Sequence, residues 1–248
     1  MIKAYKDENA LGGVKVVIEG EASDILQEFA HIGTEIYNAA LAAMGKIGDT
    51  EYDEADEYYE LEPGDHFYYS DYEYVLLDVT DSGDYFAITA DIADDLQFND
   101  KGGDGSNNWA RSELRRYLNN EYIDHMNIST KHLVKTRSDL TADNGDTEYG
   151  TCEDFVTLLS CDQYRKYREI VPHYSDYVWT LTPWSCSVGY ASTVRTVTPS
   201  GTIIRNHASN TYGVAPACTF NHEILIARRQ ARDGRIVLGE ATGSDGED

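Results

Sequence analysis

The sequence predicts an α+β fold, in which helices and strands occupy separate stretches of the chain. Apolar residues recur every three or four positions in residues 23–45 and again in residues 107–126, which is the spacing of an amphipathic helix. Much of residues 178–220 consists instead of short apolar and polar alternations broken by turn residues, which is typical of strands. A length of 248 residues allows one large domain, or one domain with a smaller appendage.

The N-terminal residues 1–48 predict a small strand–helix module. Residues 13–19, GVKVVIE, have the composition of a strand, and Ser23 or Asp24 can cap the helix that follows. The apolar stripe of this helix consists of Ile25, Leu26, Phe29, Ile32, Ile36, Ala40 and Met44. One strand and one helix bury too little surface to stand alone. We therefore expect the module to pack on the main domain or on a partner chain, and to serve attachment or oligomerisation.

An acidic stretch separates this module from the rest. Residues 49–65 carry nine acidic side chains and no basic one. Such a run usually stays solvated, so residues 49–63 are interpreted as a linker. Calcium binding is the alternative, because hard cations prefer several carboxylate oxygens. The main domain is expected at residues 64–221, followed by a C-terminal extension, 222–248, that has a hairpin around Asp233-Gly234 and an acidic tail.

Within the main domain the clearest strands are residues 74–77 and 85–88, joined by a turn at residues 81–84. A strand at residues 155–159 precedes a short helix, and Ser160 or Asp162 is placed to start that helix. In the longer helix of residues 107–126, Leu114, Leu118 and Tyr122 share one face, and Asn107 or Asn108 can cap its start.

The charge balance disfavours several classes of partner. A formal net charge of -24 repels nucleic-acid phosphates and anionic membrane surfaces. No apolar run approaches the roughly 20 residues of a membrane span, and the first residues, MIKAYKDENALGG, lack the apolar core of a signal peptide. We expect a chain that is made in a cytosol, is not secreted by the ordinary route, binds no nucleic acid and does not insert into membranes.

The cysteines do not predict a zinc site. Cys152, Cys161, Cys186 and Cys218 form no CxxC pair and have no paired histidine. Four small buried thiols are the expected arrangement. A Cys186–Cys218 disulfide is the alternative, and it would need an oxidising location.

No catalytic signature is present. The sequence lacks G-x-S-x-G, H-E-x-x-H, a P-loop and a dinucleotide fingerprint, and His222-Glu223 has no second histidine. The loop of residues 99–108, NDKGGDGSNN, misses the order and the closing Glu of an EF-hand, so a solvated glycine-rich turn is expected there. We predict a protein that is not an enzyme and has no cofactor or metal site, with calcium left open.

One segment differs from the rest in composition. Residues 186–218 contain no Asp, Glu or Lys but many Ser, Thr, Asn, Tyr and Arg, with a turn at residues 199–201. Tyr gives contact area at low entropic cost, small polar residues give hydrogen bonds, and Arg gives planar donors. The segment is therefore a candidate binding surface. The alternative is an ordinary set of strands with a polar outward face.

Three separated stretches carry a family resemblance. NNWARSELRRYLNNEY resembles the W-x-x-S-x-L-R-x-x-L-N helix of an uncharacterised domain family common in gut bacteria and their phages. DFVTLLSCDQYRKY resembles that family's K-V-F-L-L-S strand and short helix. VWTLTPWS, ASTVRTVTPSGTI and YGVAPAC resemble its closing W-W-L-R-S-P, V-x-x-x-G and G-V-R-P-A series. The resemblance runs from about residue 64 to residue 220, in order.

Members of that family look like C-type-lectin-fold proteins, and several resemble the variable proteins of diversity-generating retroelements. In those systems adenine-directed mutagenesis diversifies the codons of exposed residues on a fixed scaffold. The resemblance implies a C-type-lectin-like domain with a diversifiable binding face at about residues 184–212. The implied scaffold is Trp179, Pro183, Val194, Val197, Gly201, Gly213, Val214 and Pro216. The implied exposed, ligand-binding face is Trp184, Ser185, Ser187, Tyr190, Thr193, Arg195, Arg205, Asn206, His207, Ser209, Asn210 and Tyr212.

Two positions depart from the family pattern. Thr182 stands nearest to the arginine of W-L-R-S-P, and Ala215 replaces the arginine of G-V-R-P. If those arginines support the fold in other members, this chain has replaced them.

The resemblance implies a phage virion protein that displays a receptor-binding, or adhesin, domain. Its expected partners are a host cell-surface protein or glycan, other virion proteins and further copies of itself, since multivalency raises modest single-site affinity. Its expected location is the virion, after synthesis in the host cytoplasm. The alternative is a head-decoration or other structural virion protein. An enzyme of the related sulfatase-modifying type is the third hypothesis, and no reactive-cysteine pair supports it.

Overall fold

The computed structural model describes residues 2–6, 14–18, 57–70, 72–230 and 233–240. The chain divides into two units, Met1–Tyr52 and Asp53–Asp248. In the first unit, β1 (Ile2–Lys6) and β2 (Val14–Ile18) form an antiparallel pair, which confirms the strand expected at residues 13–19. The helix expected at residues 23–45 and most of the acidic linker lie outside the described residues.

The second unit is an α+β structure made mostly of strands, as the sequence predicts in outline. Its nine-stranded sheet has the order β11-β16-β6-β5-β4-β18-β17-β3, with β8 also paired to β16. Its members are β3 (Glu57–Tyr58), β4 (His66–Tyr69), β5 (Tyr72–Val79), β6 (Tyr85–Thr89), β8 (Leu133–Val134), β11 (Val156–Thr157), β16 (Ala217–Phe220), β17 (Leu225–Arg229) and β18 (Ile236–Glu240). The expected strands at residues 74–77 and 85–88 are confirmed as parts of β5 and β6.

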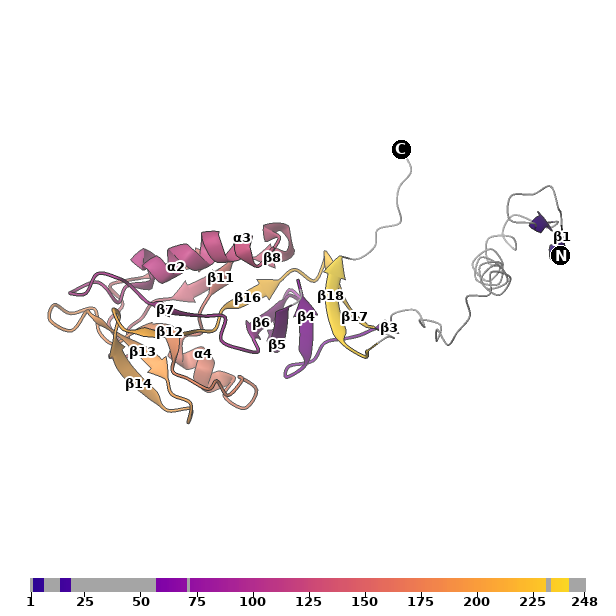
Figure 1. Ribbon diagram of the computed structural model, residues 1–248. Coiled ribbons are helices and arrows are strands. Elements are labelled where there is room, and N and C mark those ends of the chain that lie inside the picture. The colour runs from indigo at the N-terminus through magenta and orange to yellow at the C-terminus, as the bar shows by residue number, and fades with distance from the viewer. Residues whose placement is uncertain (1, 7–13, 19–56, 71, 231–232, 241–248) are drawn as a thin grey trace. The chain divides into compact units, whose positions relative to one another are not determined.

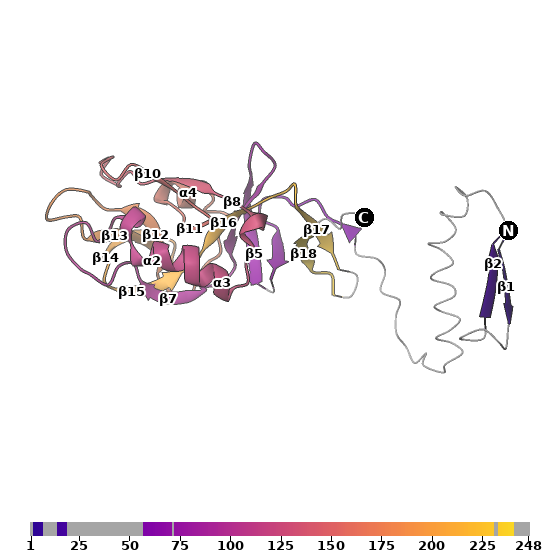
Figure 2. The ribbon, with the colours of Figure 1, turned by 90° about the horizontal axis from the view of Figure 1, so that it is seen from above.

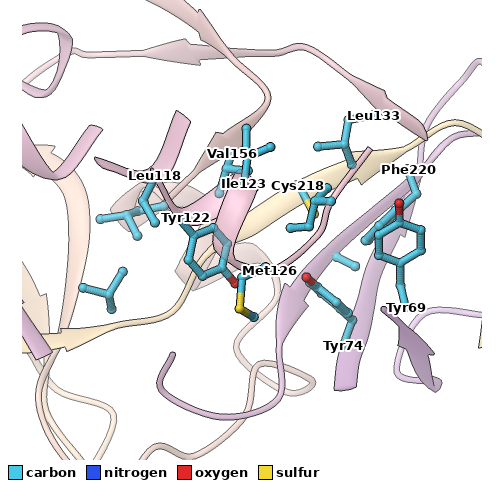
Figure 3. Packing of buried hydrophobic residues seen from close by; sticks show 14 of the residues in the cluster. Tyr69, Tyr74, Leu118, Tyr122, Ile123, Met126, Leu133, Val156, Cys218 and Phe220 are labelled. Atoms are coloured by element: carbon cyan, nitrogen blue, oxygen red, sulfur yellow. The ribbon is translucent and has the colours of Figure 1, made fainter. Parts of the chain in front are cut away.

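Alternate side chains of β5 enter two different apolar clusters. Tyr74 and Leu76 belong to the larger cluster, which includes the buried helical residues Leu114 and Leu118. Val75 and Leu77 belong to the other cluster. This is the period-two pattern of a strand that is buried on both faces. Figure 1 shows α2 and α3 along one side of β11 and β16, with α4 on the opposite side, and Figure 3 shows the larger cluster from close by.

The helix expected at residues 107–126 is built from four shorter pieces. They are the 3-10 turn η1 (Trp109–Arg111), α2 (Glu113–Tyr117), the π-helical η2 (Leu118–Tyr122) and α3 (Ile123–His125). Asn108 accepts a hydrogen bond from the backbone N–H of Ala110, and Ser112 accepts one from that of Arg115. The second cap interrupts the helix after η1, which periodicity alone does not reveal.

The short helix α4 (Cys161–Lys166) begins at Ser160, in a capping box with Gln163. The strand expected before it is shorter than residues 155–159, since β11 covers only Val156–Thr157. The reason is that the carbonyl of Leu159 accepts its hydrogen bond from Leu181, in the other sheet.

That other sheet has five strands, in the order β14-β13-β12-β15-β7. They are β7 (Asp94–Gln97), β12 (Val178–Pro183), β13 (Thr193–Val197), β14 (Ile203–His207) and β15 (Thr211–Val214). Smaller elements are η3 (Thr130–His132) and the antiparallel pair β9 (Thr136–Asp139) and β10 (Thr151–Asp154). Figures 1 and 2 show the five-stranded sheet at one end of the second unit and β17–β18 at the other.

The C-terminal hairpin expected around Asp233-Gly234 is confirmed as β17–β18. It belongs to the nine-stranded sheet, because β18 pairs in parallel with β4 and β17 pairs with β3. Leu225–Arg229 and Ile236–Glu240 therefore extend the main sheet, and so does Glu57–Tyr58 from the acidic stretch.

All four cysteines are free thiols, so the alternative of a Cys186–Cys218 disulfide is wrong. Three of the four are buried, as the sequence predicts, whereas Cys152 is half-buried. Among the described residues, no helix combines the length and apolar character that crossing a membrane requires.

Candidate ligand-binding face

A loop at residues 184–193, here called the binding loop, joins β12 to β13 and is closed at its base by hydrogen bonds. The backbone N–H of Trp184 donates to the carbonyl of Thr193 at 2.9 Å. Asn107 is completely buried, and its Nδ2 donates to the carbonyls of Ser185 at 3.0 Å and Thr193 at 2.9 Å. The hydroxyl of Tyr149 donates to Oδ1 of Asn107 at 2.8 Å. The hydrogen bonds of the Asn107 side-chain amide thus hold the base of the loop in place.

Two carboxylates hold the tip of the binding loop. Oδ2 of Asp146 accepts hydrogen bonds from the Ser185 hydroxyl at 3.2 Å, the Cys186 backbone N–H at 3.3 Å and the Ser187 hydroxyl at 3.2 Å. The hydrogen bond from the Asn144 side chain, followed by that from Cys186, lowers the pKa of Asp146. Asp104 accepts from the backbone N–H of Gly189 at 2.8 Å.

The held tip presents apolar surface to solvent. Val188 is 87% exposed and Tyr190 is 61% exposed. A tyrosine on a loop whose backbone is already fixed offers a large contact area that needs little further ordering.

Two arginines lie over Trp184. Arg195 on β13 and Arg205 on β14 are directly opposite each other in the antiparallel register. Their Cζ atoms lie 4.2 Å and 5.0 Å from the centroid of the Trp184 ring. Residues opposite each other share a face of a sheet, so both guanidinium groups reach the same indole.

The two guanidinium groups differ in how they are paired. Arg195 forms an ion pair with Asp143, whose backbone N–H donates to the carbonyl of Pro183 at 2.9 Å. Its Nε is buried without a hydrogen-bond partner among the described residues. Arg205 is exposed and, within the described part of the chain, its guanidinium lies over Trp184 but makes no hydrogen bond or ion pair. The Arg205 guanidinium is therefore open to a ligand.

The set of twelve predicted face residues is divided between two faces of the five-stranded sheet. Thr193, Arg195, Arg205 and His207 occupy one face, because Thr193 pairs with His207 and Arg195 with Arg205. Together with Trp184 and the exposed tip residues Ser187 and Tyr190, they are called the outward face below.

Two predicted members lie on the opposite side, so the expectation of a single exposed face is wrong. Asn206 is opposite the fully buried Val194, and its Nδ2 donates to the Thr196 hydroxyl at 2.7 Å. The Tyr212 hydroxyl donates to Oδ1 of Asn206 at 3.0 Å, and its ring centroid is 5.0 Å from that of Trp179. The reason is the period of two along a strand, which points neighbours such as Arg205 and Asn206 in opposite directions.

Ser185 requires a second correction. It is only 4% exposed, because its hydroxyl donates to Asp146 and accepts from the backbone N–H of Ser187. Asn210 is exposed and donates to the Tyr212 hydroxyl at 3.2 Å. Ser209 is half-buried, and its carbonyl accepts from Gln97 at 2.6 Å.

The predicted scaffold residues are all buried: Trp179, Pro183, Val194, Val197, Gly201, Gly213, Val214 and Pro216. The two positions that depart from the family pattern are buried as well. The Thr182 hydroxyl accepts from the backbone N–H of Cys161 at 2.9 Å, at the first residue of α4. Ala215 packs in the second apolar cluster.

Sequence reasoning missed the residues that hold the binding loop. Asn107 is 78 residues from Ser185 along the chain, and the sequence suggests for it only a place in a turn or at a helix cap. Asp104 lies in the glycine-rich turn expected at residues 99–108, and the sequence suggests no role for Asp143 or Asp146. The position of Asn107 directly before Asn108 and the WARSEL motif is the one signal in the sequence. Contacts between a carboxylate and a loop distant in sequence produce no recognisable sequence motif.

Among the residues that the structure describes, no three His, Cys, Asp or Glu side chains gather as ligands for a metal ion. Calcium binding by the acidic linker stays a prediction, because residues 49–56 lie outside the described part.

A family model with the description "Domain of unknown function (DUF6273)" matches residues 82–222, which is more than half of the chain. No curated protein and no solved structure matches the chain.

Proposed function

The chain belongs to the DUF6273 family. We propose that it is a non-catalytic ligand-binding protein whose site is the outward face. The observation that carries the proposal is the pair of arginines over Trp184, one of them without a polar partner in the described structure. Trp, Tyr and Arg are the residue types that dominate binding hot spots, and all three are present here on one anchored loop and two strands.

The electrostatics of the outward face favour a ligand with anionic groups. Residues 186–218 carry no acid, although the chain has a formal net charge of -24. The nearby carboxylates are engaged: Asp143 with Arg195, Asp146 with the loop, and Asp104 with Gly189. The Arg205 guanidinium is the exposed cation of the face, and its planar donors match carboxylate or phosphate groups.

The biological setting in the proposal follows from the family resemblance. We propose a C-type-lectin-like receptor-binding protein of a phage virion, which attaches to a protein or glycan on the host cell. The outward positions suit diversification, because Tyr190, Arg205 and His207 are exposed and can change without disturbing the core. Asn206 and Tyr212 belong to the fixed scaffold, because the Tyr212 hydroxyl donates a hydrogen bond to the Asn206 side-chain amide.

A structural virion role is the second candidate, and the position of β14 favours it. Among the described strands, β14 pairs with β13 alone and is an edge of the five-stranded sheet. An exposed edge strand can pair with a neighbouring subunit. In that case the outward side chains would contribute nothing to cell attachment.

The test is binding of the purified chain to candidate host cells, for the wild type and for Arg205→Ala and Tyr190→Ala. We expect each change to weaken binding about tenfold, while the thermal unfolding temperature stays unchanged. Tyr58→Ala is the matched control, because Tyr58 is 65% exposed and lies on β3. Equal binding by all four proteins would reject the outward face as the site and favour the structural role.

A further inference from the structure

A groove of about 480 Å³ lies where β5, β6 and β7 meet the helical segment of residues 117–126. It shares no residue with the outward face. Its size is in the range of pockets that hold small organic molecules or single side chains. We call it the tyrosine groove, after Tyr68, Tyr72, Tyr117 and Tyr122 in its lining.

The tyrosine groove is negatively charged. Glu73, Asp91 and Asp94 line it, and no Lys or Arg does, so His125 is its one basic side chain. Asp94 accepts a hydrogen bond from the Tyr117 hydroxyl at 3.0 Å. Burial, with Asp94 beside it, raises the pKa of Tyr117 to about 12, so this phenol remains a neutral donor.

Four tyrosines contribute aromatic surface to the lining of the groove. Tyrosine faces attract ammonium and guanidinium groups through the ring quadrupole. Tyr68 already makes such a contact, with the Cζ of Arg235 lying 5.1 Å from its ring centroid. Tyr72 is 39% exposed, which is unusual for a large ring in this chain.

Two buried hydroxyls of the lining are unsatisfied. Thr89 is 5% exposed and Tyr122 is 3% exposed, and neither hydroxyl has a hydrogen-bond partner among the described residues. The Tyr122 hydroxyl is directed toward that of Tyr74, but the two do not reach hydrogen-bonding geometry (Figure 3). The Thr89 hydroxyl is therefore an unpaired polar group within the lining of the groove.

We propose that the tyrosine groove binds an organic cation, that is, an alkylammonium or quaternary ammonium group with an apolar body. Glu73, Asp91 and Asp94 supply the charge, the tyrosines supply aromatic surface, and the volume is large enough for an organic cation. The cation can belong to a free small amine or to a lysine side chain of another protein.

The test is titration of the full chain, followed by NMR, with three probes. Choline supplies a free quaternary ammonium. Nα-acetyl-lysine amide supplies the side-chain ammonium of a lysine within a protein. The third probe, 3,3-dimethylbutanol, is the neutral isostere of choline. We expect at least one cation to bind and to shift the amide signals of residues 89–94 and 117–126, while the isostere binds about tenfold more weakly or not at all. Tighter binding of choline points to a small amine, and tighter binding of the lysine probe to a protein partner.

Two variants and a control separate binding from folding. Asp94→Asn should weaken cation affinity about tenfold, whereas Asp95→Asn, at the neighbouring exposed position outside the lining, should leave it unchanged. Tyr122→Phe should change neither cation affinity nor stability, since the hydroxyl that it removes is buried, unpaired and directed toward Tyr74 rather than into the groove. Equal binding of choline and its isostere, equal effects at Asp94 and Asp95, or no binding of either cation would overturn the proposal. None of these outcomes bears on the outward face.

Discussion

At the scale of single residues, Asn107 connects the helical segment to the binding loop. Its amide makes three hydrogen bonds inside the protein, two to carbonyls of the loop and one from Tyr149. Because the side chain is completely buried, water does not replace these bonds when the amide is removed. The geometry of the loop therefore depends on one side chain distant in sequence.

Replacing this residue gives the first prediction. Asn107→Ala should lower the free energy of unfolding by about 2–4 kcal/mol, since it leaves two carbonyls and a phenol without partners. Chemical denaturation measures the loss. Asn108→Ala is the control, because Asn108 caps only η1, and its removal should cost about 1 kcal/mol. Equal losses at the two positions would contradict the role given to Asn107.

The second residue-scale prediction concerns Cys152. Burial, aided by the neighbouring Asp154, raises the pKa of the Cys152 thiol to about 12, and its Sγ donates to Asp154 at 3.3 Å. The reactive thiolate is then scarce at neutral pH. We expect an aromatic disulfide reagent at pH 8 to modify the native chain slowly and all four thiols rapidly in denaturant. Fast modification of Cys152 in the native protein, located by peptide mapping, would contradict this assignment.

At the scale of elements, the binding loop should respond to acid through Asp146. The hydrogen bonds from Asn144 and Cys186 favour the carboxylate and lower its pKa, so its contribution to the loop is present above the usual Asp value of about 3.9. That contribution is lost as the pH falls through the lowered pKa. The Cys186 amide signal should therefore stay constant from pH 7 to about pH 5 and move only below about pH 4. In Asp146→Asn the same signal should not titrate, and a midpoint near pH 6 would contradict this assignment.

The same loop and strands mark the limit of what composition predicts. The acid-free segment identified Tyr190 and Arg205, which are exposed. It also included Asn206 and Tyr212, because composition does not show which residues of a strand point inward. The pairing of Asn206 with the buried Val194 shows that Asn206 does. The cap at Ser160 was predictable from local rules, whereas the carboxylates that hold the loop come from segments that meet it only in the fold.

At the scale of the whole molecule, the folding unit is larger than the stretch that matches the family. The match covers residues 82–222, but β5 lies between β6 and β4 in the main sheet, and β17 and β18 extend it. Leu76 of β5, Leu225 of β17 and Leu238 of β18 are buried. A fragment limited to the match would expose the partners of these side chains.

The corresponding prediction compares two fragments. Residues 57–240 should unfold cooperatively on heating and give dispersed NMR spectra. Residues 82–222 should not, because half of β6's pairing and much of the larger apolar cluster are missing. Cooperative unfolding of the shorter fragment would mean that β5, β17 and β18 are appended to an independent core.

The C-terminal limit of this unit could not be predicted from the sequence. The hairpin at Asp233-Gly234 was predictable from its turn residues, but its membership of the main sheet depends on the parallel pairing of Val237 with Tyr68. Pairing between strands so far apart in sequence follows from topology, and no local propensity encodes it. The sequence pattern therefore predicts many individual strands of the second unit, but not which residues mark the ends of that unit.

A substitution scan of residues 184–212, with each variant scored for folded yield and for host-cell binding, tests whether the outward face binds a ligand on a fixed scaffold. The account predicts that changes at Tyr190, Arg205 and His207 keep the folded yield and lower binding, whereas changes at Val194, Thr196 and Asn206 lower the folded yield. If the outward changes leave binding intact while the wild type binds cells, or if Asn206 tolerates every substitution as Arg205 does, the account is wrong.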